Sequence, residues 1–230
     1  MRIATYNVEW FNYLFHDDGS LVNDDSWSAR WDVTKAMQTA ALGAVFRSMD
    51  ADAVMIIEAP DTSPRRSTVK ALETFAEHAE LRTTKAVTGF TNDTQQEIAL
   101  LYDPQTLQAR HDPQEAANAP LFDQAYHRDL NVDAAPDAIR WSKPPLEVAL
   151  TTANGALRLI GVHAKSKAPH GAQNEAEATR ISIENRRKQL AQCIWLRKRV
   201  EQHLTAKDDL IVMGDFSDGP GLDEDERLFG

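Results

Sequence analysis

The sequence predicts an α+β protein in which a mostly antiparallel β-sandwich carries helices on its outer faces. Short apolar runs typical of buried strands and longer stretches with helical spacing alternate along the chain. A hairpin signal, Asn154-Gly155, lies between apolar runs at 146–152 and 156–163. Hairpin-linked strands speak against a purely parallel doubly wound sheet.

The predicted elements follow one another without internal repeats or a linker, so we expect one domain over residues 1–230. The helical segments show apolar residues three or four positions apart, as at Val33, Met37, Ala40 and Ala44. Residues 112–140 have several prolines and no firm period, which predicts a long surface excursion that can face a substrate. Strands are expected at 2–7, 52–58, 97–102, 146–152, 156–163 and, as a central strand, 210–214; helices are expected at 31–49, 67–80 and 179–203.

Composition limits the kinds of partner that the protein can have. A net charge of −10 argues against a broad basic face, although bound divalent cations or local basic clusters keep nucleic acid among the candidates. No apolar run is long enough to span a bilayer. The single Cys193 and the lack of a visible signal peptide predict a cytoplasmic protein.

Four predicted strands end in a polar side chain that can bind a metal or move a proton. The residues are Asn7, Glu58, His163 and Asp215. Any one of them has an ordinary alternative, such as a turn residue for Asn7 or a solvated carboxylate for Glu58. Together they predict a catalytic centre at one edge of the sheets.

The residue types at these ends favour a hard cation. Glu58 offers carboxylate oxygens and Asn7 an amide oxygen, which suit Mg²⁺ or Mn²⁺ better than zinc. Glu9 lies two residues after Asn7, on the same side of an extended chain, and is a candidate second acidic ligand.

The residues at the other two strand ends, His163 and Asp215, favour a reaction at a phosphoryl group. Lys165 and Lys167 follow His163, and an imidazole beside ammonium groups can hold a phosphate and stabilise its transition state. The alternative is a surface histidine in a solvated basic loop. Asp215 can orient or deprotonate water, and Ser217 can support it or simply build the next turn.

Two common catalytic motifs are missing from the sequence. There is no Gly-x-Ser-x-Gly elbow of a serine hydrolase, and no glycine-rich phosphate loop. Metal-assisted attack of water on a phosphoester remains the reaction that these residues favour.

Six segments carry short motifs in a fixed order along the chain, namely Thr5-Tyr-Asn-Val-Glu-Trp10, Ile56-Ile-Glu58, Glu97-Ile-Ala-Leu-Leu-Tyr-Asp103, Lys143-Pro-Pro-Leu146, Val162-His-Ala-Lys-Ser-Lys167 and Gly214-Asp-Phe-Ser-Asp218. These ordered motifs resemble the endonuclease/exonuclease/phosphatase superfamily, whose members include DNase I-like nucleases, inositol-polyphosphate 5-phosphatases and bacterial sphingomyelinases. The resemblance covers nearly the whole chain. It implies a four-layered α/β/β/α sandwich and Mg²⁺-dependent hydrolysis of a phosphoester substrate.

The resemblance also implies roles for individual residues. Glu58 matches the principal metal carboxylate, and Glu9 matches a position that is acidic in some relatives. His163 matches the histidine that contacts the scissile phosphate, and Asp215 the aspartate that positions water. We therefore expect Glu58, Asn7 and Glu9 at the metal, Lys143, Lys165 and Asn7 at the phosphate, and His163, Asp215 and Ser217 as catalytic residues.

The chain departs from the family pattern in two places. Ser217 stands where the family usually has asparagine, which removes an amide from the phosphate site. The family's downstream Ser-Asp-His motif, with its general base, is absent before Gly230. We expect that the last strands are missing from this sequence and that the 230-residue chain has weak or no activity. A phospho-ligand or nucleic-acid binding protein that keeps the fold is the alternative.

Aromatic residues cluster in the segment after the first predicted strand. They could line a groove and stack on bases, or they could belong to the core. These residues are Phe11, Tyr13, Phe15, Trp27 and Trp31.

Overall fold

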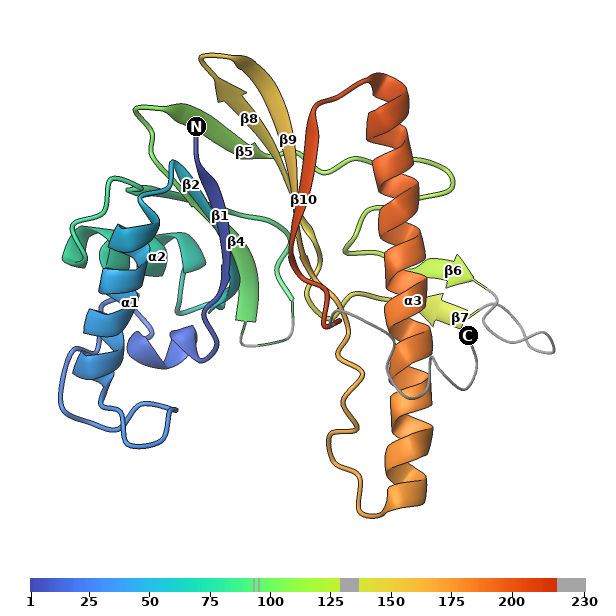
Figure 1. Ribbon diagram of the computed structural model, residues 1–230, viewed down its shortest axis with the longest axis horizontal. Coiled ribbons are helices and arrows are strands. Elements are labelled where there is room, and N and C mark those ends of the chain that lie inside the picture. Colours follow the sequence, from blue (N-terminus) through green and yellow to red (C-terminus); the bar gives the residue numbers. More distant parts are fainter. Residues whose placement is uncertain (93, 95, 129–136, 219–230) are drawn as a thin grey trace.

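Two four-stranded sheets pack face to face, and helices cover the outer face of each (Figure 1). The computed structural model describes residues 1–92, 94, 96–128 and 137–218. One sheet has the order β1 (Ile3–Asn7), β2 (Ala53–Pro60), β4 (Gln96–Tyr102), β3 (Lys85–Thr88), and the other has the order β10 (Leu210–Asp215), β9 (Gly155–His163), β8 (Leu146–Thr152), β5 (Leu107–His111).

Helices α1 (Lys35–Met49) and α2 (Thr68–His78) lie on the first sheet, and the long α3 (Glu175–Ala206) lies on the second (Figure 1). A 3₁₀ helix, η1 (Phe11–Leu14), follows β1, and a small ribbon pairs β6 (Tyr126–Arg128) with β7 (Asp137–Ile139). Within the described ranges, no helix is both long and apolar enough to cross a membrane. The layers follow the predicted α/β/β/α order.

Three apolar cores separate the layers. The core between the sheets contains Met55, Ile57, Leu100 and Leu159, all fully buried. A Cβ atom on Gly161 would lie 2.4 Å from the Met55 sulfur, so the glycine lets the sheets approach closely. The other two cores lie between each sheet and its helices.

Both sheets are mixed. Each has two antiparallel strand pairs and one parallel pair, β1 with β2 and β10 with β9. Among the described residues, β10 is the first strand in the order of its sheet and therefore lies at an edge. The prediction of a central strand at 210–214 is wrong in this respect. The parallel pairs matter for function because they bring the carboxyl ends of neighbouring strands to the same edge.

The first helix begins four residues later than predicted. Thr34 caps it by accepting a hydrogen bond from the Met37 backbone N–H at 3.2 Å, so residues 31–34 belong to the preceding loop. The sequence also missed four strands, namely the short pair β6 and β7 and the strands β3 and β5. The segments of β3 and β5 are short and contain polar residues, and most of their side chains are only partly buried. They therefore contain no continuous apolar run that would predict a strand.

In its described part, the predicted surface excursion at 112–140 is mostly exposed or half-buried, and a few of its apolar residues pack against the fold. Phe122 and Ile139 are buried, as is Trp141 just after the segment, and both Phe122 and Trp141 contact Trp195 of α3. Residues 129–136 lie outside the described residues. The apolar contacts of this segment are scattered among prolines and polar residues, so they carry no period.

A buried ion pair fixes α3 to the second sheet. Arg199 Nε lies 2.9 Å from Glu147 Oε1, and both side chains are almost completely buried. The guanidinium also donates to the carbonyls of Ala119 and Pro120 at 3.2 and 3.0 Å. His203 lies 4.0 Å from the same Glu147 oxygen, which together with Asp208 raises its pKa.

Candidate active site

The carboxyl ends of β1, β2, β9 and β10 meet at one edge of the two sheets. Asn7 is the register partner of Ile57, next to Glu58, and Asp215 is the partner of His163. Asn7 Nδ2 donates to Asp215 Oδ2 at 3.0 Å and so joins the two sheets. The four predicted strand-end residues are therefore brought together.

An irregularity in β2 sets the direction of the Glu58 side chain. The register of β2 and β4 shifts between Ile57 and Ala59, and Glu58 has a φ of 63°. A non-glycine residue in this left-handed region is strained, and such bulges often re-aim a side chain at a functional site. Gln96 Nε2 donates to Glu58 Oε2 at 2.5 Å and fixes the carboxylate.

Lys143, His163 and Glu58 form a compact triangle. Lys143 Nζ lies 3.6 Å from Glu58 Oε1 and 3.2 Å from His163 Nδ1, while His163 Nε2 lies 3.9 Å from the same Glu58 oxygen. All three side chains are largely buried. Because the lysine ammonium can only donate, it favours the tautomer with the proton on Nε2.

The buried environment of this triangle shifts the pKa values of His163 and Lys143. Burial, reinforced by the positive charge of Lys143, lowers the pKa of His163 to about 4. Burial also lowers the pKa of Lys143, although Glu58 and Asp215 oppose the shift. At neutral pH the site thus offers a neutral imidazole that can donate from Nε2.

Asp215 is held as an anion by its hydrogen bonds. Burial alone would raise its pKa, but donors at Ser217 N (2.7 Å) and Asn7, with His163 and Lys143 nearby, lower it instead. A Cβ on Gly214 would lie 2.1 Å from the Val162 carbonyl oxygen, so only glycine lets β10 run this close to β9. Ser217 Oγ donates to the Ala164 carbonyl at 3.1 Å, which turns the hydroxyl towards the backbone.

Glu9 and Lys167, which the sequence places next to site residues, are each paired with another side chain. Glu9 has its carboxylate 3.2 Å from Arg30, with about half of the side chain exposed, and only its backbone N–H reaches Asn7. Lys167 is paired with Asp218 at 2.7 Å. Lys165 remains close enough to influence the pKa of Lys143. The structure therefore brings together Asn7, Glu58, Lys143, His163 and Asp215, while the described contact of the Glu9 carboxylate is with Arg30.

The donor set fits a hard cation that keeps much of its water. Mg²⁺ commonly binds through one or two carboxylates, waters and substrate phosphate. Glu58 supplies such a carboxylate at a site otherwise lined by oxygen and nitrogen donors. The described part of the chain contains no group of three His, Cys, Asp or Glu residues able to hold a metal by themselves.

Gln96 is a site residue that sequence reasoning missed. It belongs to the first position of β4 and pairs with Pro60, close to the β2 irregularity. The strand expected at 97–102 begins one residue after Gln96, so no sequence signal marked this residue as a partner of Glu58. A cross-strand contact depends on register, which a single sequence does not reveal.

Glu97, the register partner of Ala59, is a buried carboxyl group. It is 2% exposed and accepts a hydrogen bond from Asn92 Nδ2 at 2.7 Å. Burial raises its pKa from 4.5 to about 7. The folded protein therefore retains a proton between these pH values that the unfolded chain releases.

This proton makes stability depend on pH. The free energy of unfolding should fall by on the order of 3 kcal/mol as pH rises from 4.5 to 7, because the unfolded state binds fewer protons there. Glu97→Gln should remove this slope and be the more stable form at pH 8, as measured by urea unfolding across pH. A variant that keeps the wild-type slope would assign the proton to another group.

The aromatic cluster divides into two classes. Phe11 and Phe15 are buried in the core beneath α2, whereas Tyr13, Trp27 and Trp31 are exposed. The sequence could not separate them, because burial depends on which face of η1 and its loop meets the sheet.

No protein-family model and no curated protein matches the chain. Its structure is similar to a β-hairpin deletion mutant of beta toxin from Staphylococcus aureus, with 13% identity, a TM-score of 0.50, and coverage of 99% of this chain and 71% of that chain. It is also similar to humanised TDP2 from D. rerio carrying 14 mutations, with 12% identity, a TM-score of 0.49, and coverage of 100% and 69%.

Beta toxin belongs to the DNase I-like superfamily. Its likeness to this chain extends over almost all of the chain and agrees with the layer order described above. The chain therefore has the DNase I-like fold of the endonuclease/exonuclease/phosphatase superfamily.

Proposed function

We propose that this protein is a Mg²⁺-dependent phosphoester hydrolase, a phosphodiesterase, nuclease or phosphatase. The observation that carries the proposal is the convergence of Glu58, His163, Lys143 and Asp215 at the joined strand ends. A neutral imidazole, a buried ammonium and an anionic carboxylate within one small site suit the hydrolysis of a phosphoester.

Each residue has a distinct task in this proposal. Glu58 would hold Mg²⁺, which when bound polarises the phosphoryl oxygen and stabilises the leaving group. His163 donates from Nε2 to a phosphoryl oxygen, and Lys143 adds positive charge beside it. Asp215, kept anionic and oriented by Asn7 and Ser217, positions the attacking water.

The second candidate is a protein that binds a phospho-ligand or nucleic acid without hydrolysing it. Ser217 favours this alternative, because its hydroxyl is bonded to the Ala164 carbonyl and not directed by any described contact to the site. The Ser-Asp-His motif expected after Gly230 remains a prediction that the coding sequence beyond this residue tests. A cytoplasmic location is likewise proposed, on the single Cys193.

The deciding experiment measures hydrolysis by the complete gene product with Mg²⁺ and with EDTA. Plasmid DNA, RNA, sphingomyelin, inositol phosphates and a bis-aryl phosphate cover the main substrate classes. We expect turnover of at least one phosphoester that stops with EDTA and returns with Mg²⁺. Saturable binding of these compounds without any turnover would support the binding protein and contradict the hydrolase.

A further inference from the structure

The loop before α1 is closed upon itself and builds a pocket. Trp27 and Thr34 form an antiparallel bridge, and Ser28 N donates to the Val33 carbonyl at 2.9 Å. Arg30 attaches the loop to the end of β1 by donating to the Val8 carbonyl at 3.5 Å and to Glu9 Oε2 at 3.2 Å. The loop is therefore held in one conformation near the strand that carries Asn7.

Two tryptophans on this loop face solvent instead of the core. Trp31 is 96% exposed and Trp27 is 67% exposed. They line a pocket with a volume of about 550 Å³, together with residues 28–30 and Asp32. Tryptophan buries more apolar area than almost any other residue, so two exposed indoles on a closed loop indicate a ligand surface.

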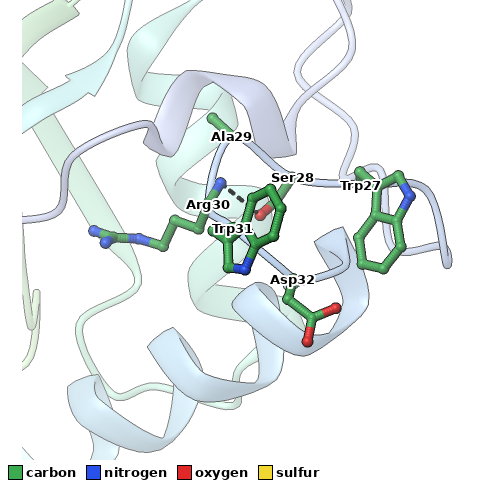
Figure 2. Close-up of a pocket in the computed structure, with 6 residues that line it drawn as sticks. All are labelled: Trp27, Ser28, Ala29, Arg30, Trp31 and Asp32. Carbon is green, nitrogen blue, oxygen red and sulfur yellow. Dashed lines mark hydrogen bonds between the residues drawn. The ribbon is translucent and has the colours of Figure 1, made fainter.

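The charge of the pocket selects the kind of ligand. In Figure 2 the Asp32 carboxylate lies below the two indole rings in this view, while the Arg30 side chain extends away from them. The Arg30 guanidinium is already paired with Glu9.

We propose that this pocket binds an organic cation of the quaternary ammonium type. The faces of tryptophan rings attract such cations through their negative quadrupole, and an adjacent carboxylate adds a direct charge interaction. A nucleotide would bring its phosphates against Asp32, which disfavours base stacking here. A neutral apolar ligand would gain nothing from the carboxylate.

The test uses the tetramethylammonium ion and choline as probes, and 3,3-dimethylbutanol as the neutral molecule of nearly the same shape as choline. Binding to the full chain is followed by tryptophan fluorescence and by NMR of the indole N–H groups. We expect saturable binding of both cations and at least a tenfold weaker affinity for the neutral alcohol. Equal affinity for the alcohol and choline, or no saturable binding of the cations, would overturn the proposal.

Matched variants assign the binding to this pocket. Trp31→Leu and Trp27→Leu keep an apolar side chain but remove the aromatic face, and each should weaken tetramethylammonium binding at least tenfold. Asp32→Asn suits the same backbone, whose φ is 54°, because asparagine tolerates the left-handed region, and it should weaken binding severalfold at low salt. Tyr13→Leu, an exposed aromatic that does not line the pocket, should leave the affinity unchanged.

These side chains are exposed, so the variants should fold, and circular dichroism checks that they do. Unchanged tetramethylammonium affinity in both tryptophan variants would exclude this pocket as the site. Adenosine monophosphate serves as the competing probe. If it bound more tightly than choline and its binding were lost in the same variants, the pocket would be a base-stacking site and the cation proposal would be wrong.

A quaternary ammonium group can come from a free compound or from a lipid headgroup. Free phosphocholine is therefore compared with vesicles of phosphatidylcholine, and vesicles of phosphatidylglycerol serve as the anionic control. Tryptophan-dependent binding of phosphocholine alone indicates a free ligand, whereas additional binding to phosphatidylcholine vesicles indicates a headgroup. Tryptophan-dependent preference for phosphatidylglycerol over both would contradict a cation site. All these measurements detect binding and do not depend on the proposed hydrolysis.

Discussion

Glu58→Gln is expected to reduce the Mg²⁺-dependent turnover of the complete gene product by about 10³-fold or more, equivalent to about 4 kcal/mol of transition-state stabilisation. Glutamine keeps the size of the side chain and can still accept from Gln96, but it removes the negative charge that would hold the cation. The loss should therefore be electrostatic, with the fold unchanged.

Two measurements separate this role from a structural one. Isothermal titration of Mg²⁺ should show weakened binding in Glu58→Gln, whether or not the protein is active. Glu201→Gln removes a carboxylate from the exposed side of α3 and should preserve both turnover and Mg²⁺ affinity. If Glu58→Gln retained wild-type turnover and Mg²⁺ binding, our assignment of the metal carboxylate would be wrong.

Arg199→Met is expected to lower the free energy of unfolding by about 3–5 kcal/mol. The change leaves the Glu147 carboxylate buried without its main cation, and it removes the donors to the Ala119 and Pro120 carbonyls. His203 can replace part of the lost charge only when it is protonated. The destabilisation should therefore increase as the pH rises through the raised pKa of His203.

Urea unfolding at pH 5.5 and pH 8 measures this effect. The double variant Arg199→Met, Glu147→Leu should recover more than half of the lost stability, because no uncompensated charge then remains in the interior. Arg197→Met, which breaks an exposed pair with Glu201 on the same helix, should barely change the unfolding midpoint. A double variant less stable than Arg199→Met would show that the ion pair is not the source of the loss.

Sequence patterns predicted most of the fold because burial imposes a period on long elements. The strands ending at Asn7 and His163 and the helices over most of α1, α2 and α3 follow such patterns. The strands β3 and β5 were missed because their side chains are only partly buried. The packing of Phe122 and Trp141 against α3 was missed because isolated apolar residues have no period.

The sequence was sufficient to predict which residue types form the candidate site and that they lie where strands end. The sequence indicated Glu58, His163 and Asp215, since each terminates an apolar run. It could not indicate Gln96, whose contact with Glu58 depends on the register of β2 and β4. Nor could it indicate that the Glu9 side chain turns to Arg30, because Glu9 leaves the extended conformation with a φ of 50°.

The apolar run that ends in Gly214-Asp215 shows where sequence information stops. The sequence by itself determined that a carboxylate follows an apolar strand, because chain order and the apolar run can be read from it directly. Only the tertiary structure decided that this carboxylate meets Asn7 from the other sheet and remains anionic beside His163 and Lys143. Distances and local electric fields arise between segments far apart in the chain, so they exist only once the two sheets have packed.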